Sequence, residues 1–368
     1  MIVKKLSLAG FRNIKNASLG FSGGINILYG KNAQGKTNIL ESIYICATGR
    51  SHRTRFDSRL IDFNGHEAHI KVEIENMGRQ NRIDVHLKKD EKNGVKGIAV
   101  NGIPIKKSGD LFGTLYCVIF SPEDLQLIKN SPGERRRFID MELCQLKNVY
   151  YYDLGQYYKV LKQRNSLLKK IQKNYSFRDT VSVWDEQLAA YGMRVIENRE
   201  KFIKKISRIA GEKHSKITGG AEKLEICYRP NCHAEELLTK TAQNLERDII
   251  FGSTSAGPHK DDIIFTVNGS DVKVYGSQGQ QRTAALSAKL AEIDIIKEET
   301  GTSPVLLLDD VLSELDSARQ RFLFESINGV QSVVTCTGIE DIAKNYSGKG
   351  GVFFVENGNV TPAIKNKA

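Results

Sequence analysis

The chain has 368 residues, of which 26% are charged and 40% are hydrophobic. This composition is ordinary for globular proteins and excludes a wholly disordered chain, and the length allows two domains or one domain with a large insertion. No apolar run approaches the roughly 20 residues of a membrane-spanning helix, and the residues after Met1 predict no signal peptide. The six cysteines form no CxxC pair, which predicts reduced thiols and argues against zinc. We therefore expect a cytoplasmic protein without a membrane partner.

The net charge of +11 is concentrated in two regions of the chain. Residues 129–173 contain 11 Lys or Arg and 4 Asp or Glu, and residues 194–216 contain 8 and 3. Regional positive charge is typical of a protein that binds a polyanion. The solvated outer face of a structural element explains the same charge equally well, and the sequence does not decide between the two.

The first 120 residues are predicted to form strands and turns around one helix. Alternating or apolar residues predict strands at 4–8, 25–29, 70–75 and 82–88, and helical spacing predicts a helix at 38–47. Asn101-Gly102 between two short apolar runs predicts a hairpin.

The middle of the chain changes to a helical period. Apolar residues recur every three or four positions over 139–171 and again over 184–209, with the polar stretch 172–179 between them. Two such stripes predict a long antiparallel helical hairpin with arms of about 30 residues each. Tyr150 and Tyr157 lie on the apolar positions, so we expect them to pack in the seam between the arms.

Strand signals return after residue 211. We expect strands at 224–228, 263–267, 272–275, 305–308 and 332–335, helices at 278–299 and 317–327, and a final hairpin at 356–359. This order predicts an α/β fold with mixed sheets, in which residues 1–128 and 211–368 form one lobe. Residues 129–210 are then an inserted helical lobe.

Residues 30–37 match the GxxxxGK[ST] pattern of a phosphate-binding loop, and they lie between a predicted strand and a predicted helix. Gly30 and Gly35 allow the backbone to curl so that successive N–H groups face phosphate oxygens. We expect Lys36 to pair with the β- and γ-phosphates and the Thr37 hydroxyl to bind Mg²⁺. The pattern predicts an ATP site formed by Gly30, Lys31, Asn32, Ala33, Gln34, Gly35, Lys36 and Thr37.

Two acids follow the apolar run 305–308 near the other end of the chain. Such a run is typical of a buried parallel strand, and ligands bind at the carboxyl ends of these strands. Asp309 is therefore the expected second Mg²⁺ ligand. Asp310 is the candidate for polarising the attacking water, which makes Asp310 and Lys36 the predicted catalytic residues.

A second phosphate-binding helix start is predicted at residues 275–282, which read YGSQGQQR. One nucleotide does not need two such surfaces within one subunit. We therefore expect Ser277 and Gly279 to touch the γ-phosphate of ATP bound to another copy of the chain. The sequence thus predicts a homodimer that ATP holds together.

These motifs, in this order, resemble the ABC-type ATPase heads of the SMC family and, within it, the RecF family of bacterial recombination mediators. Further segments that look like RecF-family blocks are residues 11–13, 47–51, 120–125, 132–138 and 257–262. The resemblance implies an ABC/SMC-type P-loop ATPase head, assembled from both chain ends, with an inserted α-helical hairpin lobe. It also adds Arg12, Asn13 and Gln280 to the expected nucleotide contacts.

The resemblance implies an ATP-dependent DNA-binding protein of recombinational repair that acts at gapped DNA or at single-strand/double-strand junctions. It further implies a weak DNA-stimulated ATPase that works with RecO and RecR to load the recombinase RecA. Two departures from the wider pattern stand out. Asp310 occupies a position where most ABC and SMC ATPases carry Glu, and residues 333–337 lack the switch histidine of many ABC ATPases.

The sequence leaves two other functions open. The ATPase subunit of a membrane transporter is expected to carry a standard LSGGQ and a switch histidine, and a small-molecule kinase needs neither a signature helix nor regional positive charge. For the DNA-binding function, phosphate neutralisation calls for flexible cations. Candidate contacts are Arg50, Arg53, Arg55, Arg59, Lys159, Lys162, Arg164, Lys169, Lys170 and Lys173.

Overall fold

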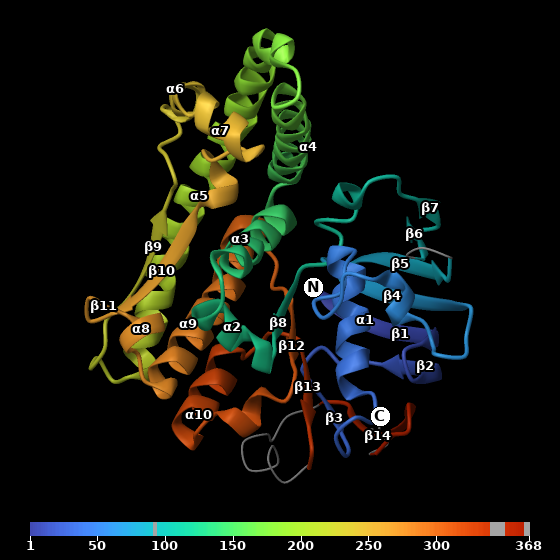
Figure 1. Cartoon of the computed structure of the whole chain (residues 1–368). Coiled ribbons are helices and arrows are strands. Elements are labelled where there is room, and N and C mark those ends of the chain that lie inside the picture. Colours follow the sequence, from blue (N-terminus) through green and yellow to red (C-terminus); the bar gives the residue numbers. More distant parts are fainter. Residues whose placement is uncertain (91–93, 339–349, 364–368) are drawn as a thin grey trace. The chain divides into compact units, whose positions relative to one another are not determined.

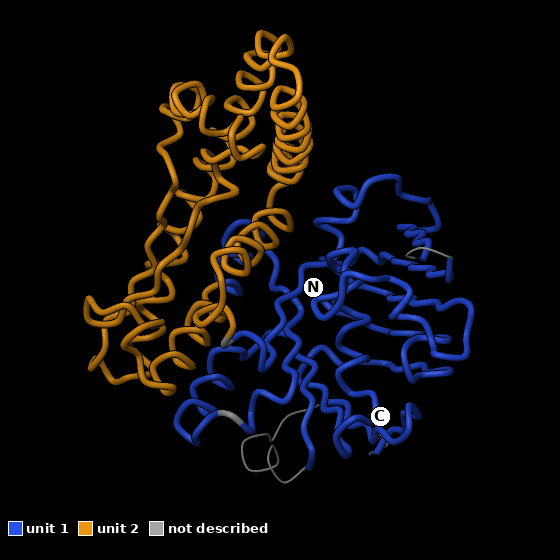
Figure 2. The backbone as a smooth tube through the Cα atoms, in the orientation of Figure 1, with its two compact units in different colours: residues 1–124, 292–368 blue, residues 125–291 orange. Residues whose placement is uncertain are grey.

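The computed structural model describes residues 1–90, 94–338 and 350–363 (Figure 1). The chain divides into two compact units, the first made of residues 1–124 and 292–368 and the second of residues 125–291 (Figure 2). The first unit therefore contains both ends of the chain, and the second unit is inserted between them.

The first unit contains an antiparallel sheet with the strand order β2-β1-β4-β5-β6-β7. Apolar residues alternate with polar ones along its strands, so that Ala68, Ile70 and Val72 of one strand are buried while their neighbours face solvent. The strands are β1 (Ile2–Phe11), β2 (Ile14–Gly20), β4 (Glu67–Asn76), β5 (Arg79–Lys88), β6 (Val95–Val100) and β7 (Ile103–Pro104).

A second sheet of the first unit has the order β15-β14-β3-β13-β12-β8, in which only the edge strand β15 runs antiparallel to its neighbour. Its central strands are mostly apolar and are buried without alternation because both faces are covered. The strands are β3 (Ile25–Tyr29), β8 (Cys117–Phe120), β12 (Val305–Leu308), β13 (Ser332–Cys336), β14 (Val352–Glu356) and β15 (Asn359–Pro362). The predicted strand at 305–308 is confirmed.

Helix α1 (Lys36–Thr48) lies in the core of the first unit, with buried residues on all of its faces. One apolar cluster includes Ile39 and Ile43 of this helix together with residues of both sheets. The unit is completed by α10 (Ser317–Ser326) and by the short turns η1 (Asp57–Leu60), η2 (Ser108–Asp110), η3 (Pro122–Leu125) and η6 (Val311–Glu314).

The second unit is built on a helical hairpin of α4 (Asn148–Ile171) and α5 (Val181–Ile217), joined through η4 (Tyr175–Thr180). The hairpin prediction is confirmed, and Tyr150 and Tyr157 are buried as expected. The first predicted arm is wrong in one respect, because it consists of two helices, α3 (Pro132–Leu146) and α4. Lys147 between them has an extended backbone and ends the helical hydrogen bonding.

A small antiparallel sheet, β9 (Leu224–Arg229), β10 (Asp262–Val267) and β11 (Ser270–Asp271), packs against α5 in the second unit. The predicted strand at 272–275 is wrong, because Asp271 accepts a hydrogen bond from the Lys273 N–H and starts the helical turn α8 (Val272–Tyr275). The remaining elements are α2 (Gln126–Lys129), α6 (Leu237–Gln243), α7 (Leu245–Phe251), η5 (Pro258–Lys260) and α9 (Gln278–Thr300). Helix α9 belongs to the second unit up to Ala291 and to the first unit from Glu292 on.

The compact units differ from the predicted lobes at residues 125–128 and, on a larger scale, at residues 211–291. The sequence groups these residues with the chain ends, whereas in the structure they belong to the unit of the hairpin. The reason is local packing, because β9 follows α5 directly, lies along it and pairs with β10.

Arg164 was predicted to contact DNA, and this is wrong because its side chain is fully buried. Its Nε donates to Asp185 at 2.6 Å, and its Nη1 donates to Asp248 at 2.7 Å. The two carboxylates come from α5 and α7, so this arginine holds three helices of the second unit together. Helical spacing places a residue on a face, but it does not show that a charged residue on the apolar face has buried partners.

We expect Arg164→Ala to destabilise the second unit by about 3–5 kcal/mol, because it leaves two buried carboxylates without their cation. Lys162→Ala, an exposed position on the same helix, is the control and should change stability by less than about 0.5 kcal/mol. Urea denaturation followed by the fluorescence of Trp184, the one tryptophan of the chain, measures both. Equal midpoints for the two variants would contradict the structural role.

Candidate nucleotide-binding site

The predicted phosphate-binding loop connects β3 to α1 in the first unit. Its backbone takes left-handed φ angles at Gly30 (152°), Ala33 (62°) and Gly35 (114°). A Cβ at Gly30 would lie 2.2 Å from the Val355 carbonyl oxygen, so only glycine fits between β3 and β14. Helix α1 begins at Lys36 with Gly35 as its N-cap, which offers no side-chain cap, so its first N–H groups remain for an anion.

Lys36 folds back over this loop. Its ammonium is almost fully buried and donates to the carbonyl oxygens of Gly30 (2.7 Å) and Lys31 (3.0 Å). An ammonium has three N–H donors, so one remains for a ligand. Residues 31–33 at the top of the loop are exposed, which leaves the loop open to solvent.

The hairpin of β14 and β15 makes hydrogen bonds to the phosphate-binding loop. The Gly358 N–H donates to the Gln34 carbonyl at 2.9 Å, and the Asn357 N–H donates to Gln34 Oε1 at 2.6 Å. Asn13 Nδ2 donates to the same Gln34 carbonyl at 3.1 Å. The sequence predicted this hairpin from its Asn-Gly turn but gave no signal that the turn reaches the loop.

Asn13 also connects the loop to α1, since it accepts a hydrogen bond from Asn38 Nδ2 at 2.8 Å. Arg12, the other residue that the resemblance added, is in a left-handed conformation with a φ of 55°. Its guanidinium makes a bidentate pair with the fully buried Glu41 of α1, at 3.0 and 2.8 Å. Glu41 was missed by the sequence reading, although an acid among Ile39, Leu40 and Ile43 is a detectable signal.

Burial opposes the charge on Glu41, but its hydrogen bonds outweigh this cost. Desolvation raises the pKa of Glu41. The carboxylate is surrounded by Arg12, Ser51 and Arg53, whose combined effect is larger, so the pKa is lowered overall. Arg53, a predicted DNA contact, therefore has a partner here, and it also donates to Asn38 at 2.9 Å.

Asp309 meets the phosphate-binding loop at the end of β12. Its Oδ1 accepts hydrogen bonds from the hydroxyls of Thr37 (2.8 Å) and Thr335 (2.9 Å). Burial raises the pKa of Asp309, and the two hydroxyl donors counteract this only in part. The structure thus brings together the two predicted Mg²⁺ ligands, Thr37 and Asp309, although they are 272 residues apart in the chain.

Thr335 of β13 is a site residue that sequence reasoning missed. Besides donating to Asp309, its hydroxyl accepts a hydrogen bond from the Asp310 N–H at 2.8 Å. Asp310 takes a left-handed φ of 50°, which is uncommon for a residue other than glycine and which this hydrogen bond helps to hold. A buried hydroxyl within the apolar run 333–336 was the available signal.

The predicted second phosphate surface lies in the second unit, at the start of α9. Ser277 and Gln280 form a reciprocal capping pair, in which the Ser277 N–H donates to Gln280 Oε1 (3.0 Å) and the Gln280 N–H donates to Ser277 Oγ (3.2 Å). Ser277 is exposed, and Gly279 is partly exposed. The preceding turn also exposes Tyr275, of which 77% is accessible.

Glu222 fixes the orientation of the Gln280 amide. Gln280 Nε2 donates to Glu222 Oε1 at 2.9 Å, and the other oxygen of Glu222 lies 2.9 Å from Nε2 of the buried His214. His214 belongs to the last turn of α5, so the start of α9 is connected to the long hairpin helix within the same unit. The sequence gave no signal for this connection.

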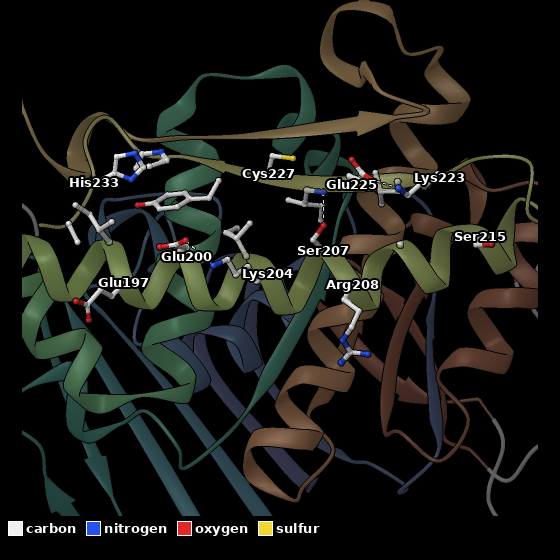
Figure 3. A pocket seen from close by; sticks show the side chains of 18 of the residues that line it. Glu197, Glu200, Lys204, Ser207, Arg208, Ser215, Lys223, Glu225, Cys227 and His233 are labelled. Carbon is white, nitrogen blue, oxygen red and sulfur yellow. Dashed lines mark hydrogen bonds and ion pairs between the residues drawn. The ribbon is translucent and has the colours of Figure 1, made fainter. Parts of the chain in front are cut away.

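A groove of about 930 Å³ lies between α5 and β9 in the second unit (Figure 3). Both acidic and basic side chains line it, among them Glu200, Lys204 and Arg208 of α5. Ser207 lies between them and accepts a hydrogen bond from the Ile226 N–H at 2.9 Å, which ties the strand to the helix. The described lining contains none of the predicted nucleotide-site residues, but it includes Glu222, which accepts a hydrogen bond from Gln280.

Most of the predicted DNA contacts are exposed, and two groups are distinguishable. The first group follows α1 in the first unit and consists of Arg50, Arg53, Arg55 and Arg59. The second group lies along α4 and just after it in the second unit, and it consists of Lys159, Lys162, Lys169, Lys170 and Lys173. His259, in the block 257–262, lies between the Tyr157 hydroxyl (2.6 Å) and the Thr254 carbonyl (3.0 Å), and burial lowers its pKa to about 4.

Comparison with known proteins gives the family. A family model described as the RecF/RecN/SMC N terminal domain matches residues 2–361. A DNA replication and repair protein RecF of Lachnoclostridium phytofermentans is 51% identical over 360 residues, which cover 98% of this chain and 99% of the relative. The chain belongs to the RecF family. This membership confirms the resemblance and contradicts the alternatives of a transporter ATPase subunit and a small-molecule kinase.

Solved structures confirm the predicted fold class. The recombination mediator protein RecF with ATP, of the RecFOR pathway, is 37% identical and superimposes with a TM-score of 0.90 over 98% of this chain and 97% of its own. The Smc head domain of Pyrococcus furiosus is 18% identical with a TM-score of 0.56 and shares the fold. No helix in the described part of the chain is long and apolar enough to cross a membrane.

The raised pKa of Asp309 predicts how this residue changes the stability of the fold with pH. The folded protein binds the Asp309 proton more tightly than the unfolded chain does. The free energy of unfolding therefore falls as the pH rises through the titration of Asp309. Asp309→Asn keeps an oxygen acceptor for Thr37 and Thr335 and removes the charge. We expect an unchanged or higher melting temperature without nucleotide at pH 7.5, with the difference shrinking toward pH 4.

The same variant should lose the rise in melting temperature that ATP with Mg²⁺ produces in the unsubstituted chain. Thermal unfolding with and without the nucleotide measures both effects. A strongly lowered melting temperature without nucleotide would show that the charge stabilises the fold instead.

Proposed function

We propose that this chain is an ATP-dependent DNA-binding protein of recombinational repair, and that ATP joins two copies of it around DNA. The main support is the meeting of Asp309 with Thr37 beside the phosphate-binding loop. The solved RecF with ATP, similar over nearly the whole chain, supports the choice of nucleotide.

The chain's own groups fit ATP and Mg²⁺. The open loop with its left-handed residues and the uncapped start of α1 present N–H groups to the phosphates, and the third Lys36 donor completes this cradle. Thr37 and Asp309 supply the hydroxyl and carboxylate oxygens that Mg²⁺ prefers. Bound Mg²⁺ would neutralise charge that develops on the phosphates.

Asp310 is the proposed base that orients the attacking water. Its position is set by the backbone hydrogen bond to Thr335, so the same threonine holds both acids. An aspartate is one methylene shorter than the glutamate of most related ATPases, and we infer that hydrolysis is slow for this reason. Slow hydrolysis suits a switch that must persist in its ATP-bound state.

Ser277, Gly279 and Gln280 are the proposed contacts to ATP on the second copy. The Ser277 hydroxyl accepts from the Gln280 N–H, which leaves its own hydrogen to donate to a phosphate oxygen. The exposed start of α9 is accessible to another subunit. Through Glu222 and His214, this contact is coupled to α5 and thereby to the hairpin.

DNA is the proposed polyanion, bound without sequence preference by the exposed cations along α4 and after α1. In this proposal the protein binds gapped or junction DNA and acts with RecR and RecO to load RecA. The solved relative's assignment to the RecFOR pathway supports these partners.

A mixing experiment tests whether the site is completed in trans. We expect neither Lys36→Met nor Ser277→Arg to dimerise with ATP in sedimentation velocity, because each removes one half of every composite site. A 1:1 mixture should partly restore dimers. In a mixed dimer, the loop of the Ser277→Arg copy and the α9 start of the Lys36→Met copy are both unsubstituted, so one of the two composite sites is intact. Dimers formed by Ser277→Arg alone would contradict the trans arrangement, and ADP in place of ATP is the control.

DNA binding should depend on both nucleotide and salt. For the unsubstituted chain with ATP, we expect affinity for a gapped duplex to fall steeply with salt concentration, because several phosphates are neutralised. Asp310→Asn should keep the ATP-dependent affinity and release DNA more slowly, whereas Lys36→Met should show no effect of ATP. Fluorescence anisotropy over a salt series measures this, and an affinity that ATP leaves unchanged in the unsubstituted chain would overturn the proposal.

A further inference from the structure

Two histidines and a glutamate converge on the outer face of the antiparallel sheet, in the first unit. The ligand atoms of Glu67, His69 and His86 all lie within 4.8 Å of one another. His86 Nε2 is 3.0 Å from one carboxylate oxygen of Glu67, and His69 Nε2 is 3.7 Å from the other. The two imidazole rings are stacked, with centroids 4.2 Å apart. Both Nε2 atoms lie beside the same carboxylate. Because the two rings are nearly parallel (7°), one of them must rotate to point both Nε2 lone pairs at one ion.

Strand geometry fixes this convergence. Glu67 and His69 are two residues apart on β4 and so point to the same face, and His86 lies directly opposite His69 on β5. The intervening Ala68 and the flanking Leu87 are buried in the core on the other face. A slip of one residue would turn these apolar side chains outward, so the core holds the three polar side chains in register.

The sheet leaves room for an ion and its water above the histidine pair. Ala9 of β1 is paired with His69, and Gly97 of β6 is paired with His86. The two imidazoles are thus flanked by a methyl group on one side and by a hydrogen on the other. A Cβ placed at Gly97 would meet open space.

The kinds of ligand atom in this cluster indicate which class of metal ion it would bind. Lys88 is the cross-strand neighbour of Glu67, and Lys71 pairs with Glu73 further along the same face. The surface is therefore not strongly acidic, which disfavours Ca²⁺ and Mg²⁺ with their preference for several oxygen ligands. Two imidazole nitrogens and one carboxylate suit Zn²⁺ and the neighbouring late transition metals.

We propose that Glu67, His69 and His86 form a surface site for a divalent transition metal of the zinc class, with water in the remaining coordination positions. Such an ion would cross-link β4 to β5 at the outer face of the sheet. The absence of CxxC pairs had argued against zinc, but that argument concerned thiol ligands and did not consider histidines on adjacent strands. The site is independent of the nucleotide site and of the proposed DNA-binding function.

Isothermal titration of the full chain with ZnCl₂, after treatment with a chelator and without nucleotide, tests the site. We expect one equivalent to bind and the affinity to fall at least tenfold in His69→Gln and in His86→Gln. His66→Gln is the matched control, because His66 is also exposed and adjacent to Glu67 but is not part of the cluster. Zn²⁺ should raise the melting temperature of the unsubstituted chain and of His66→Gln only.

Unchanged Zn²⁺ affinity in both His69→Gln and His86→Gln would overturn the proposal, as would an equal loss in His66→Gln. The substituted side chains are exposed, so the melting temperatures of the metal-free variants should match that of the unsubstituted chain. Co²⁺ in place of Zn²⁺ gives a second readout, since its visible absorption reports nitrogen and oxygen ligands. That absorption should disappear in His86→Gln.

Discussion

One carboxylate oxygen determines how the candidate nucleotide site is assembled. Asp309 Oδ1 accepts hydrogen bonds from Thr37, 272 residues earlier, and from Thr335, 26 residues later. The three segments meet because β3, β13 and β12 are consecutive parallel strands, whose carboxyl ends lie at one edge of the sheet. The phosphate-binding loop, the acid pair and the left-handed turn at Asp310 are all placed by this arrangement.

Charge plays two different roles in the second unit. The exposed lysines of α4 are available to a polyanion, whereas Arg164 and Arg199 are buried and bind carboxylates of the unit itself. Arg199 joins Asp140 of α3 to Asp261 before β10, so the block 257–262 is tied to the hairpin. A buried ion pair adds little stability compared with apolar residues, but it requires each partner to be in one place, and this constraint defines how the helices pack.

The phosphate-binding loop and the start of α9 are both held by residues remote in sequence. Gln34 of the loop receives hydrogen bonds from the turn at Asn357-Gly358, and Gln280 donates to Glu222. Each contact fixes a group proposed to bind phosphate before the ligand arrives, which reduces the entropy lost on binding. The contact of Glu222 with His214 extends this restraint to α5. In the proposed dimer, these contacts would connect the phosphate of the second copy to the helix that forms one arm of the hairpin.

The sequence alone determined the elements whose signal is local. The glycines and Lys36 of the loop, the apolar run before Asp309, the 3-4 spacing of the hairpin and the Asn-Gly turns each depend on neighbours along the chain. Tertiary structure alone decided that Arg164 is buried, that Thr335 and Glu41 contact residues of the candidate site, and that residues 211–291 pack with the hairpin. These outcomes depend on which side chain lies opposite in space, and a one-dimensional pattern carries no record of partners separated by tens or hundreds of residues.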